Sequence, residues 1–260
     1  MSAEGPARSP AAPSPPGTRV AVVTGGAKGI GWAIARALLA NGDRVVVADR
    51  DPTAVARLGA DPAVSAGRLS AVVADVGSAE GAALAVQTAL GAFECLDILC
   101  NNAGVRPVAP LLELEPARFD EALRVNVGGI YHCSRAAVPH LQARGGAIVN
   151  IASISGLVGY AGGAAYAASK AAAVMLSRVM ALELGPLGIR VNCICPGSIQ
   201  AREAPDGSVE AAPDIPVGRR GRAAEVAQLV LFLASDAAAF MNGAVLTLDG
   251  GITAGRPRRG

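Results

Sequence analysis

Tyr166 and Lys170, four residues apart, are the pair whose types and spacing point most directly to chemistry. Residues i and i+4 share a helix face, so the Lys170 ammonium can lie near the Tyr166 phenol. A free tyrosine has a pKa of about 10 and is a poor base at neutral pH, and a nearby cation favours its phenolate. Ser153, thirteen residues before the tyrosine, offers a hydroxyl that could orient the same substrate oxygen. The set could therefore move a proton to or from a carbonyl or alcohol oxygen.

A glycine-rich turn near the start of the chain is a second signal, which is needed because the phenol and ammonium alone could be ordinary packed and surface groups. Gly25, Gly29 and Gly31 follow an apolar run and open an amphipathic helical pattern. Backbone N–H groups and the helix dipole can hold a pyrophosphate there. The spacing differs from the dinucleotide fingerprint Gly-x-Gly-x-x-Gly, and Trp32 stands where a P-loop requires lysine.

Asp49 indicates which cofactor the turn would bind, because it ends the second predicted strand, eighteen residues after Gly31. A carboxylate there can accept the adenosine ribose hydroxyls and repel a 2′-phosphate, which favours NAD. Lys28 and Arg50 could both reach a phosphate and so argue for NADP. The aspartate could also be a helix N-cap or a turn residue ahead of Pro52.

Short β-branched runs alternate with longer Ala/Leu-rich stretches along the chain, and this alternation predicts the elements that carry these residues. Seven runs are expected to form buried parallel strands, at 20–24, 44–48, 69–74, 97–100, 147–151, 189–194 and 245–248. Helical patterns occupy 30–41, 79–93, 116–143, 164–185 and 223–235. The expected fold is α/β: a Rossmann-type doubly wound parallel sheet of about seven strands flanked by helices, in a single domain.

Three segments are expected along the chain of 260 residues. Residues 1–18 are rich in proline and alanine and lack the apolar stretch of a signal peptide, so a disordered leader is expected. Residues 19–252 form the catalytic NAD(P)-binding domain, and 253–260 a basic tail. Within the domain, 200–218 lacks apolar periodicity and is expected to be a long loop, part of a substrate loop near 198–218.

Together these motifs resemble the short-chain dehydrogenase/reductase family, in its compact single-domain form, from about Val20 to Gly251. The resemblance rests on several motifs in order. They are the TGxxxGIG turn at 24–31, the adenine-pocket pair Asp75 and Val76, the NNAG segment at 101–104, the helix residue Asn126, the set Ser153, Tyr166 and Lys170, and the turn at Pro196 and Gly197.

The resemblance implies roles for a catalytic set of four residues, Asn126, Ser153, Tyr166 and Lys170. Tyr166 would exchange the proton and Ser153 would orient the reacting oxygen. Lys170 would also hold the nicotinamide ribose, and Asn126 would position a water that relays protons to it. Asn126 could instead cap or bridge backbone groups within its helix region, and Asn101 and Asn102 could be turn residues.

The resemblance also implies a nicotinamide cofactor, and Asp49 favours NAD over NADP. The residue spacing gives no reason to expect a metal. The residues expected to bind the cofactor are Gly25, Lys28, Gly29, Ile30, Gly31, Asp49, Arg50, Asp75, Val76, Asn102, Ala103, Gly104, Tyr166, Lys170, Pro196, Gly197 and Ile199. One departure is Ala201, which stands where relatives often carry a threonine that contacts the nicotinamide amide. One carboxamide contact is therefore expected to be lost.

The substrate pocket is the least constrained part of the sequence. Arg106, just after the NNAG segment, could bind a carboxylate or phosphate, or be a solvated arginine. The other pocket candidates by position are Ser155, Leu157, Tyr160 and Gln200. The apolar remainder suits a ketone/alcohol pair of small or medium size.

Composition bounds the partners and the compartment. The net charge of +2 with scattered basic residues gives no footprint for nucleic acid, and no apolar run reaches membrane-spanning length. Five cysteines without metal-ligand spacing suit buried thiols in a reducing cytosol, so a cytoplasmic protein is expected. Cys193 and Cys195 share a strand face but have no further ligands nearby, and His132 and His140 have no partner pattern.

Three functions are compatible with these features. The first is an NAD-dependent oxidoreductase acting on a secondary alcohol or ketone. The second is an NADPH-dependent 3-oxoacyl-carrier-protein reductase, in which an acidic carrier meets Arg219, Arg220 and Arg222 unless these only cap the helix at Ala223. The third is a non-catalytic cofactor-binding protein. The resemblance further implies a homotetramer, packed through the helices at 116–143 and 164–185.

Overall fold

Seven parallel strands form the central sheet of the computed structural model, which describes residues 19–201, 204 and 207–255. The predicted leader and all but the first three residues of the predicted tail lie outside the described residues. The strand order is β3-β2-β1-β4-β5-β6-β9. Their bounds are β1 Val20–Thr24, β2 Arg44–Asp49, β3 Leu69–Val73, β4 Ile98–Asn101, β5 Ala147–Ile151, β6 Arg190–Pro196 and β9 Val245–Leu248. The predicted doubly wound sheet is confirmed, and each predicted run forms a strand.

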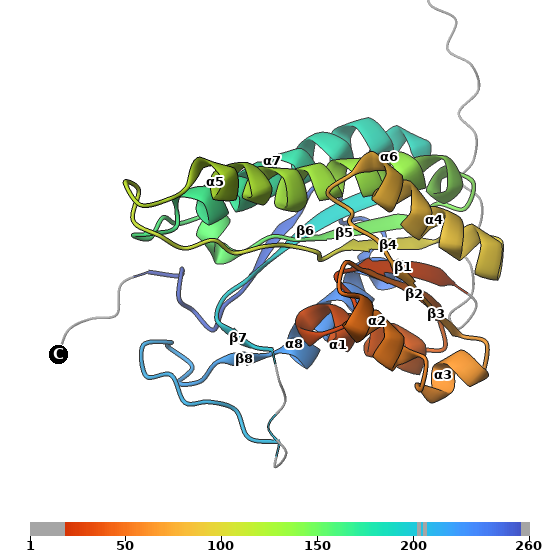
Figure 1. The fold of residues 1–260 in the computed structure, drawn as a ribbon, viewed down its shortest axis with the longest axis horizontal. Coiled ribbons are helices and arrows are strands. Elements are labelled where there is room, and N and C mark those ends of the chain that lie inside the picture. The colour runs from red at the N-terminus through yellow and green to blue at the C-terminus, as the bar shows by residue number, and fades with distance from the viewer. Residues whose placement is uncertain (1–18, 202–203, 205–206, 256–260) are drawn as a thin grey trace, which may run out of the picture.

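Helices cover both faces of the sheet, which is why its strands β1 and β5 are buried throughout (Figure 1). One layer is α4 Ala79–Phe93, α5 Pro116–Leu123, α6 Gly129–Gln142 and α7 Ala164–Leu184. The other layer contains α1 Gly29–Ala40 and α8 Ala223–Ala234. The predicted helix at 116–143 is interrupted by a π-helical turn, Arg124–Gly128, a feature common near functional sites.

Two short helices, α2 Pro52–Leu58 and α3 Pro62–Ser65, were not predicted because they are too short to show apolar periodicity. Each begins with an aspartate N-cap followed by proline, a local start signal. Asp51 caps α2 by accepting hydrogen bonds from the Thr53 and Ala54 N–H groups. The cap ahead of Pro52 is thus Asp51, which leaves Asp49 free for another role.

The carboxyl ends of the strands lie at the left of the sheet in Figure 1, toward a small two-stranded sheet of β7 Ile199–Gln200 and β8 Gly221–Arg222. The chain order reverses between neighbouring β1 and β4, and ligands of open α/β sheets bind beyond such a switch point. The described residues of the predicted loop at 198–218 contain no helix. Among the described residues, no helix is long and apolar enough to cross a membrane.

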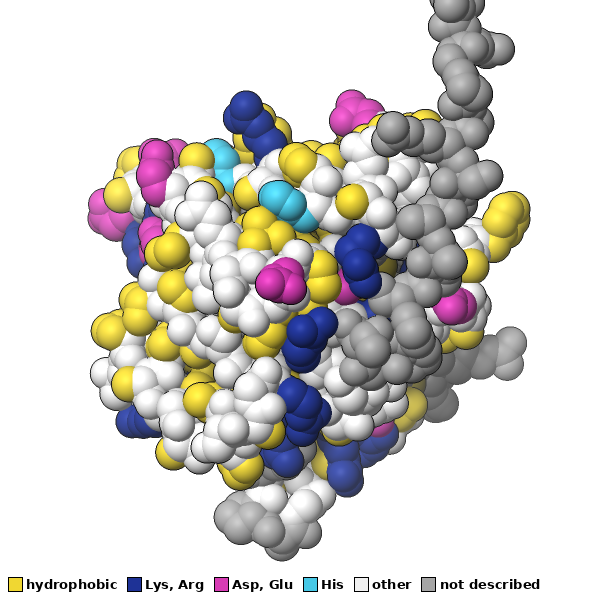
Figure 2. Space-filling view, turned by 90° about the vertical axis from the view of Figure 1, so that its right-hand side faces the viewer, with side chains coloured by type: hydrophobic (Ala, Val, Ile, Leu, Met, Phe, Trp, Pro, Cys, Tyr) yellow, Lys and Arg dark blue, Asp and Glu magenta, His cyan; other side chains and the backbone are white. Residues whose placement is uncertain are grey.

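Arginines gather at the opposite edge, where the strands begin. Figure 2 shows the side of the molecule at the right of Figure 1, with Lys and Arg side chains down its middle and acidic side chains among them. The helix C-termini, whose carbonyls carry partial negative charge, lie at this edge. Arg19 donates to the Ala234 carbonyl oxygen at 2.6 Å and Arg68 to that of Leu39 at 2.7 Å. These arginines therefore donate hydrogen bonds to carbonyl groups at the C-terminal ends of α8 and α1.

Candidate active site

Hydrogen bonds join the ends of β1 and β4 and fix the glycine-rich turn. The Thr24 hydroxyl accepts from the N–H groups of Asn102 (3.0 Å) and Ala103 (3.1 Å). The Asn102 side-chain amide donates to the carbonyls of Thr24 and Gly25, both at 3.0 Å. Asn102 therefore holds the turn in place with its amide. Thr24 was not singled out as a site residue, although its place in the TGxxxGIG motif is a signal that could have found it.

The start of α1 fits a phosphate group. Gly25 and Gly29 have φ values of +58° and +57°, which glycine adopts without strain. A Cβ on Gly31 would overlap the Gly25 carbonyl oxygen and lie 2.5 Å from Asn102 Nδ2, so the turn is closed to any side chain there. No side chain of the described residues caps the N-terminus of α1, and its first turn holds no acidic residue. Its free N–H groups suit an anion.

Asp49 lies at the end of β2 and is buried. Its carboxylate accepts from the N–H groups of Ala27 and Asp51, both at 3.1 Å, and so joins the turn to the following loop. The two cations that could favour NADP are each paired with a carboxylate. Lys28 Nζ lies 3.2 Å from Asp51 Oδ2, and Arg50 Nη1 lies 3.4 Å from Glu121 Oε1.

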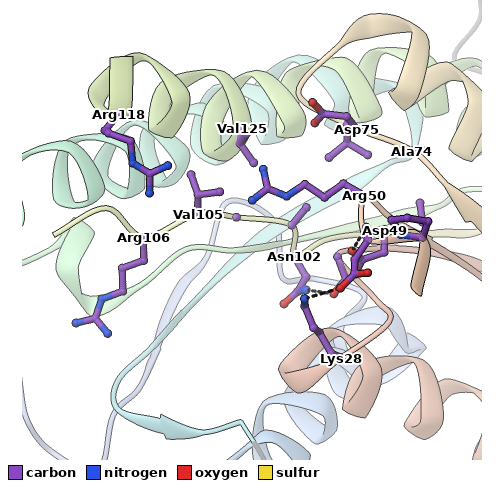
Figure 3. A pocket seen from close by; sticks show the side chains of 17 residues that line it. Lys28, Asp49, Arg50, Ala74, Asp75, Asn102, Val105, Arg106, Arg118 and Val125 are labelled. Carbon is purple, nitrogen blue, oxygen red and sulfur yellow. Dashed lines mark hydrogen bonds and ion pairs between the residues drawn. The ribbon is translucent and has the colours of Figure 1, made fainter. Parts of the chain in front are cut away.

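A cavity of about 820 Å³ opens beside this carboxylate (Figure 3). Its lining includes the predicted cofactor residues Gly25, Lys28, Asp49, Arg50, Asp75, Val76, Asn102, Ala103 and Gly104. Asp75 accepts from Arg124 Nη1 at 2.8 Å and from the Gly77 N–H at 3.0 Å. Burial pushes the pKa of Asp75 upward, but these hydrogen bonds outweigh it and hold the pKa below its usual value. Arg118 also lines the cavity, and no sequence motif marked it.

A second cavity, of about 180 Å³, contains the predicted catalytic residues Ser153, Tyr166 and Lys170. Pro196, Gly197 and Ile30 also line it, as predicted for cofactor residues. The two cavities share the lining residues Asn102, Gly104, Val105 and Arg106, so they adjoin along the segment after β4. The sheet edge thus brings together side chains that are up to 166 positions apart in the sequence, from Ile30 to Pro196.

The surroundings of Tyr166 shift the pKa of its phenol in opposite directions. Burial raises the pKa of the phenol above its usual value, while a hydrogen bond with Ser153 and the positive charge of Arg106 lower it in part. Arg106 Cζ lies 5.8 Å from the centre of the Tyr166 ring. Contrary to the sequence expectation, the net shift of the pKa is upward, because the effect of burial exceeds the effects of Ser153 and Arg106.

Lys170 is buried and lies beneath the tyrosine, with Nζ 5.8 Å from the centre of the Tyr166 ring. Nζ donates to the Ile151 carbonyl oxygen at 2.8 Å, which anchors the side chain at the end of β5. Burial lowers the pKa of Lys170 to about 8. The ammonium is therefore still mostly protonated at neutral pH.

Asn126 lies in the π-helical turn, and its side-chain amide binds Val105 and Ser169 and does not line either cavity. Oδ1 accepts from the Val105 N–H at 2.8 Å, and Nδ2 donates to the Val105 carbonyl at 2.9 Å and to the Ser169 hydroxyl at 2.8 Å. Asn126 thus bridges backbone groups, but those of Val105 rather than groups within its own helix region. Through these contacts, Asn126 connects the segment after β4 to the helix that carries Tyr166 and Lys170.

Other predicted residues lie around these cavities. Gly29 and Ala201 line a separate surface depression beside Trp32, and a Cβ on Gly29 would lie 3.6 Å from that of Ala201. Ile199 belongs to β7, where it pairs with Gly221. Four pocket candidates are absent from the lining of the 180 Å³ cavity, namely Ser155, Leu157, Tyr160 and Gln200. Of the five candidates only Arg106 lines it.

The residues fit a dinucleotide with a reactive end. Lys28, at the uncapped N-terminus of α1, and Asp49, at the end of the second strand, line the larger cavity. The proton-transfer groups line the adjoining cavity. Among the described residues there is no cluster of three side chains that could hold a metal ion.

Comparison with known proteins gives consistent matches over most of the chain. The enoyl-(acyl carrier protein) reductase family model matches residues 25–253. The chain is 38% identical over 247 residues to the trans-4-hydroxycyclohexanecarboxylate dehydrogenase of Sinomonas cyclohexanicum, covering 93% of this chain and 95% of that protein. It is also 38% identical over 247 residues to the meso-2,3-butanediol dehydrogenase of Serratia marcescens, covering 92% and 97%. A short-chain type dehydrogenase/reductase structure from Mycobacterium marinum aligns with a TM-score of 0.82 at 33% identity, covering 90% of this chain and 95% of that one.

Proposed function

The chain belongs to the short-chain dehydrogenase/reductase family, and we propose that it interconverts a secondary alcohol and a ketone of small or medium size with a nicotinamide cofactor. One observation carries the proposal. The cavity that fits a dinucleotide adjoins the cavity that holds Ser153, Tyr166 and Lys170. The relatives named for a hydroxy acid and a diol support a hydroxyl-bearing substrate.

In this proposal Tyr166 exchanges the proton of the substrate oxygen. It donates the proton to a carbonyl during reduction and accepts it from an alcohol during oxidation. The Ser153 hydroxyl, which lines the same cavity as the phenol, orients the same oxygen. A bound nicotinamide supplies the hydride donor or acceptor for the substrate carbon. Lys170 places a positive charge near the phenol ring. Asn126 connects Val105, after β4, to Ser169 on α7 and so fixes these two segments relative to each other.

We favour NAD over NADP. An ionised carboxylate has about four acceptor positions, and Asp49 uses one on each oxygen for backbone N–H groups, so acceptor capacity remains for ribose hydroxyls. Lys28 and Arg50 are paired with Asp51 and Glu121. These exposed pairs are weak, so the preference rests mainly on the charge of Asp49.

The alternative of an NADPH-dependent 3-oxoacyl-carrier-protein reductase draws support from a relative named 3-oxoacyl-[acyl-carrier-protein] reductase, from Chlamydia trachomatis, which is 35% identical over 240 residues. Two of its three proposed docking arginines are engaged within the chain. Arg219 pairs with Glu225 at 2.7 Å, and Arg220 pairs with Glu210 at 2.8 Å. Glu225 in turn accepts from the Arg222 N–H at the start of α8. This favours the helix-capping interpretation of the cluster over carrier docking.

The proposal is tested by titrating the purified protein with NADH and NADPH in parallel, following nicotinamide fluorescence, and then screening secondary alcohols with the preferred oxidised cofactor. We expect tighter NADH binding and turnover of at least one alcohol. Tighter NADPH binding would promote the carrier-protein reductase. Cofactor binding without turnover across alcohols and ketones would leave a non-catalytic cofactor-binding protein, and failure to bind either cofactor would overturn the proposal.

A further inference from the structure

We propose that Arg106 binds an anionic group of the substrate, so that the enzyme acts on secondary alcohols that carry a carboxylate. This inference rests on the proposed function and adds a substrate class to it. A guanidinium group can bind oxyanions of either planar or tetrahedral shape. We propose a carboxylate because its two oxygens can accept two parallel hydrogen bonds from the guanidinium.

The position of Arg106 is the first support. It lies two residues after Gly104, on the segment shared by the two cavities, and it lines both of them. Its Cζ is 5.8 Å from the centre of the Tyr166 ring. A molecule whose hydroxyl meets the phenol therefore lies within reach of the guanidinium.

The availability of its charge is the second support. The other arginines of the larger cavity wall are engaged, because Arg50 and Arg118 both pair with Glu121. Among the described residues, no carboxylate forms an ion pair with Arg106, whose side chain is exposed. In Figure 3 its side chain is turned away from Asp49 and Lys28. The guanidinium is thus open to a ligand from the catalytic side.

The charge balance of the smaller cavity is the third support. Among the described residues, its lining contains two cationic side chains, Arg106 and Lys170, and no acidic one. Lys170 is buried and already donates to the Ile151 carbonyl. The other lining side chains are apolar, such as Ile30 and Ile151, or neutral and polar, such as Asn102. A substrate anion would find a positive field and little competing negative charge.

The competing role for Arg106 is to act on Tyr166 alone, as a cation over its ring. That role would affect every substrate in the same way, whether charged or neutral. Anion binding affects only substrates that carry the charge. Pairs of substrates that differ by one negative charge therefore separate the two roles.

The test uses three hydroxy acids with increasing separation of the two groups, 3-hydroxybutanoate, 4-hydroxypentanoate and trans-4-hydroxycyclohexanecarboxylate, each beside its methyl ester. We expect at least one acid to exceed its ester in kcat/KM by about 10-fold or more, since hydrogen bonds between charged groups are the strong ones. Arg106→Gln should lower kcat/KM for that acid by about 10- to 100-fold, chiefly through a higher KM. The acid and its ester should then have similar values of kcat/KM. Arg106→Lys should restore part of the loss.

Arg135→Gln on the exposed face of α6 is the matched control and should leave the acid-to-ester ratio unchanged. A sulfonate analogue, 2-hydroxypropanesulfonate, distinguishes a carboxylate site from one for tetrahedral oxyanions. An equal loss for acid and ester in Arg106→Gln, or no acid preferred over its ester by the unmodified enzyme, would overturn the inference.

A binding measurement keeps the inference separate from the proposed function. In a Tyr166→Phe variant saturated with NADH, 4-oxocyclohexanecarboxylate should bind with a Kd about 10-fold or more below that of its methyl ester, and Arg106→Gln should abolish the difference. If that difference is seen while no alcohol is oxidised by the unmodified protein, the proposed function fails and anion binding stands. If alcohols are oxidised and the difference is absent, the reverse holds.

Discussion

At the scale of single residues, Tyr166 is the group on which the proposed chemistry depends. Tyr166→Phe removes the exchangeable proton and keeps the ring that packs near Lys170 and Arg106. We predict a kcat lower by roughly 10²- to 10⁴-fold, the usual size of a general acid–base contribution. The Kd for NADH should stay within about 3-fold, because the ring and its neighbours are retained. Steady-state kinetics and nicotinamide fluorescence measure the two, and a variant with near-normal turnover would remove Tyr166 from the mechanism.

The raised pKa of Tyr166 gives the reaction a directional pH dependence. Tyr160 and Cys195 add to the effect of burial, while Ser153 and Arg106 oppose it. A neutral phenol is ready to donate, so ketone reduction should proceed at neutral pH, whereas kcat/KM for alcohol oxidation should rise with pH toward the phenol pKa. Arg106→Gln removes a charge that lowers this pKa, so the rising limb should move to higher pH. The profile is measured with a neutral alcohol, and a shift to lower pH would contradict this account.

At the scale of elements, the glycine-rich turn after β1 packs closely against the segment after β4. Gly31→Ala would force a methyl group onto the Gly25 carbonyl oxygen and the Asn102 amide. We predict a loss of about 1–3 kcal/mol in the free energy of unfolding, typical of overpacking, and more than about 10-fold weaker dinucleotide binding because the N–H groups move.

Gly91→Ala is the matched control for this substitution. Gly91 is an exposed glycine within α4, and a Cβ there meets no atom within 4 Å. The change should raise stability by about 0.5–1 kcal/mol, because alanine loses less backbone entropy in a helix. Thermal unfolding of both variants gives the comparison. If Gly31→Ala unfolds like the control, close packing does not explain the glycine at 31.

The sequence predicted the long elements well because their signals are local and strong. Apolar runs bounded by turns predicted β1, β5 and β9 with the bounds that the structure has, and periodicity predicted α4. The short helices α2 and α3 and the two-residue strands β7 and β8 were missed. Such short segments are stabilised by caps and by tertiary pairing, which apolar patterning does not reveal.

The sequence predicted which residues lie together in the candidate site, but not the direction in which the pKa of Tyr166 is shifted. Spacing alone suggested that Lys170 would lower the pKa of Tyr166, yet burial decides the direction of the shift. Burial depends on how α7 packs over β5 and β6, and spacing within one helix carries no information on it. The Asn126 bridge to Val105 likewise depends on the π-helical turn, which is defined by backbone geometry.

At the scale of the whole molecule, the family, the α/β fold and the enzyme class predicted from sequence are confirmed by the comparisons. The catalytic edge and the arginine-rich edge lie at opposite ends of the strands. This follows from a parallel sheet, because every strand carboxyl end and every following helix N-terminus meet at one edge, and every helix C-terminus lies at the other. Anion binding and helix-end capping by cations are thereby separated.

The outer face of α7 bears on how many copies of the chain assemble. Met175, Val179 and Leu182 are 55%, 42% and 79% exposed, and their spacing places them along one side of the helix. Monomeric proteins rarely leave such an apolar stripe open to water, so we predict a homotetramer with this stripe in an interface. Light scattering after size exclusion should give about four times the chain mass of 25.9 kDa.

Leu182→Glu would bury an unpaired charge and should yield smaller species, whereas Leu84→Glu, on α4, should not. A monomeric wild type, or an assembly unaffected by Leu182→Glu, would mean that this stripe is not an interface.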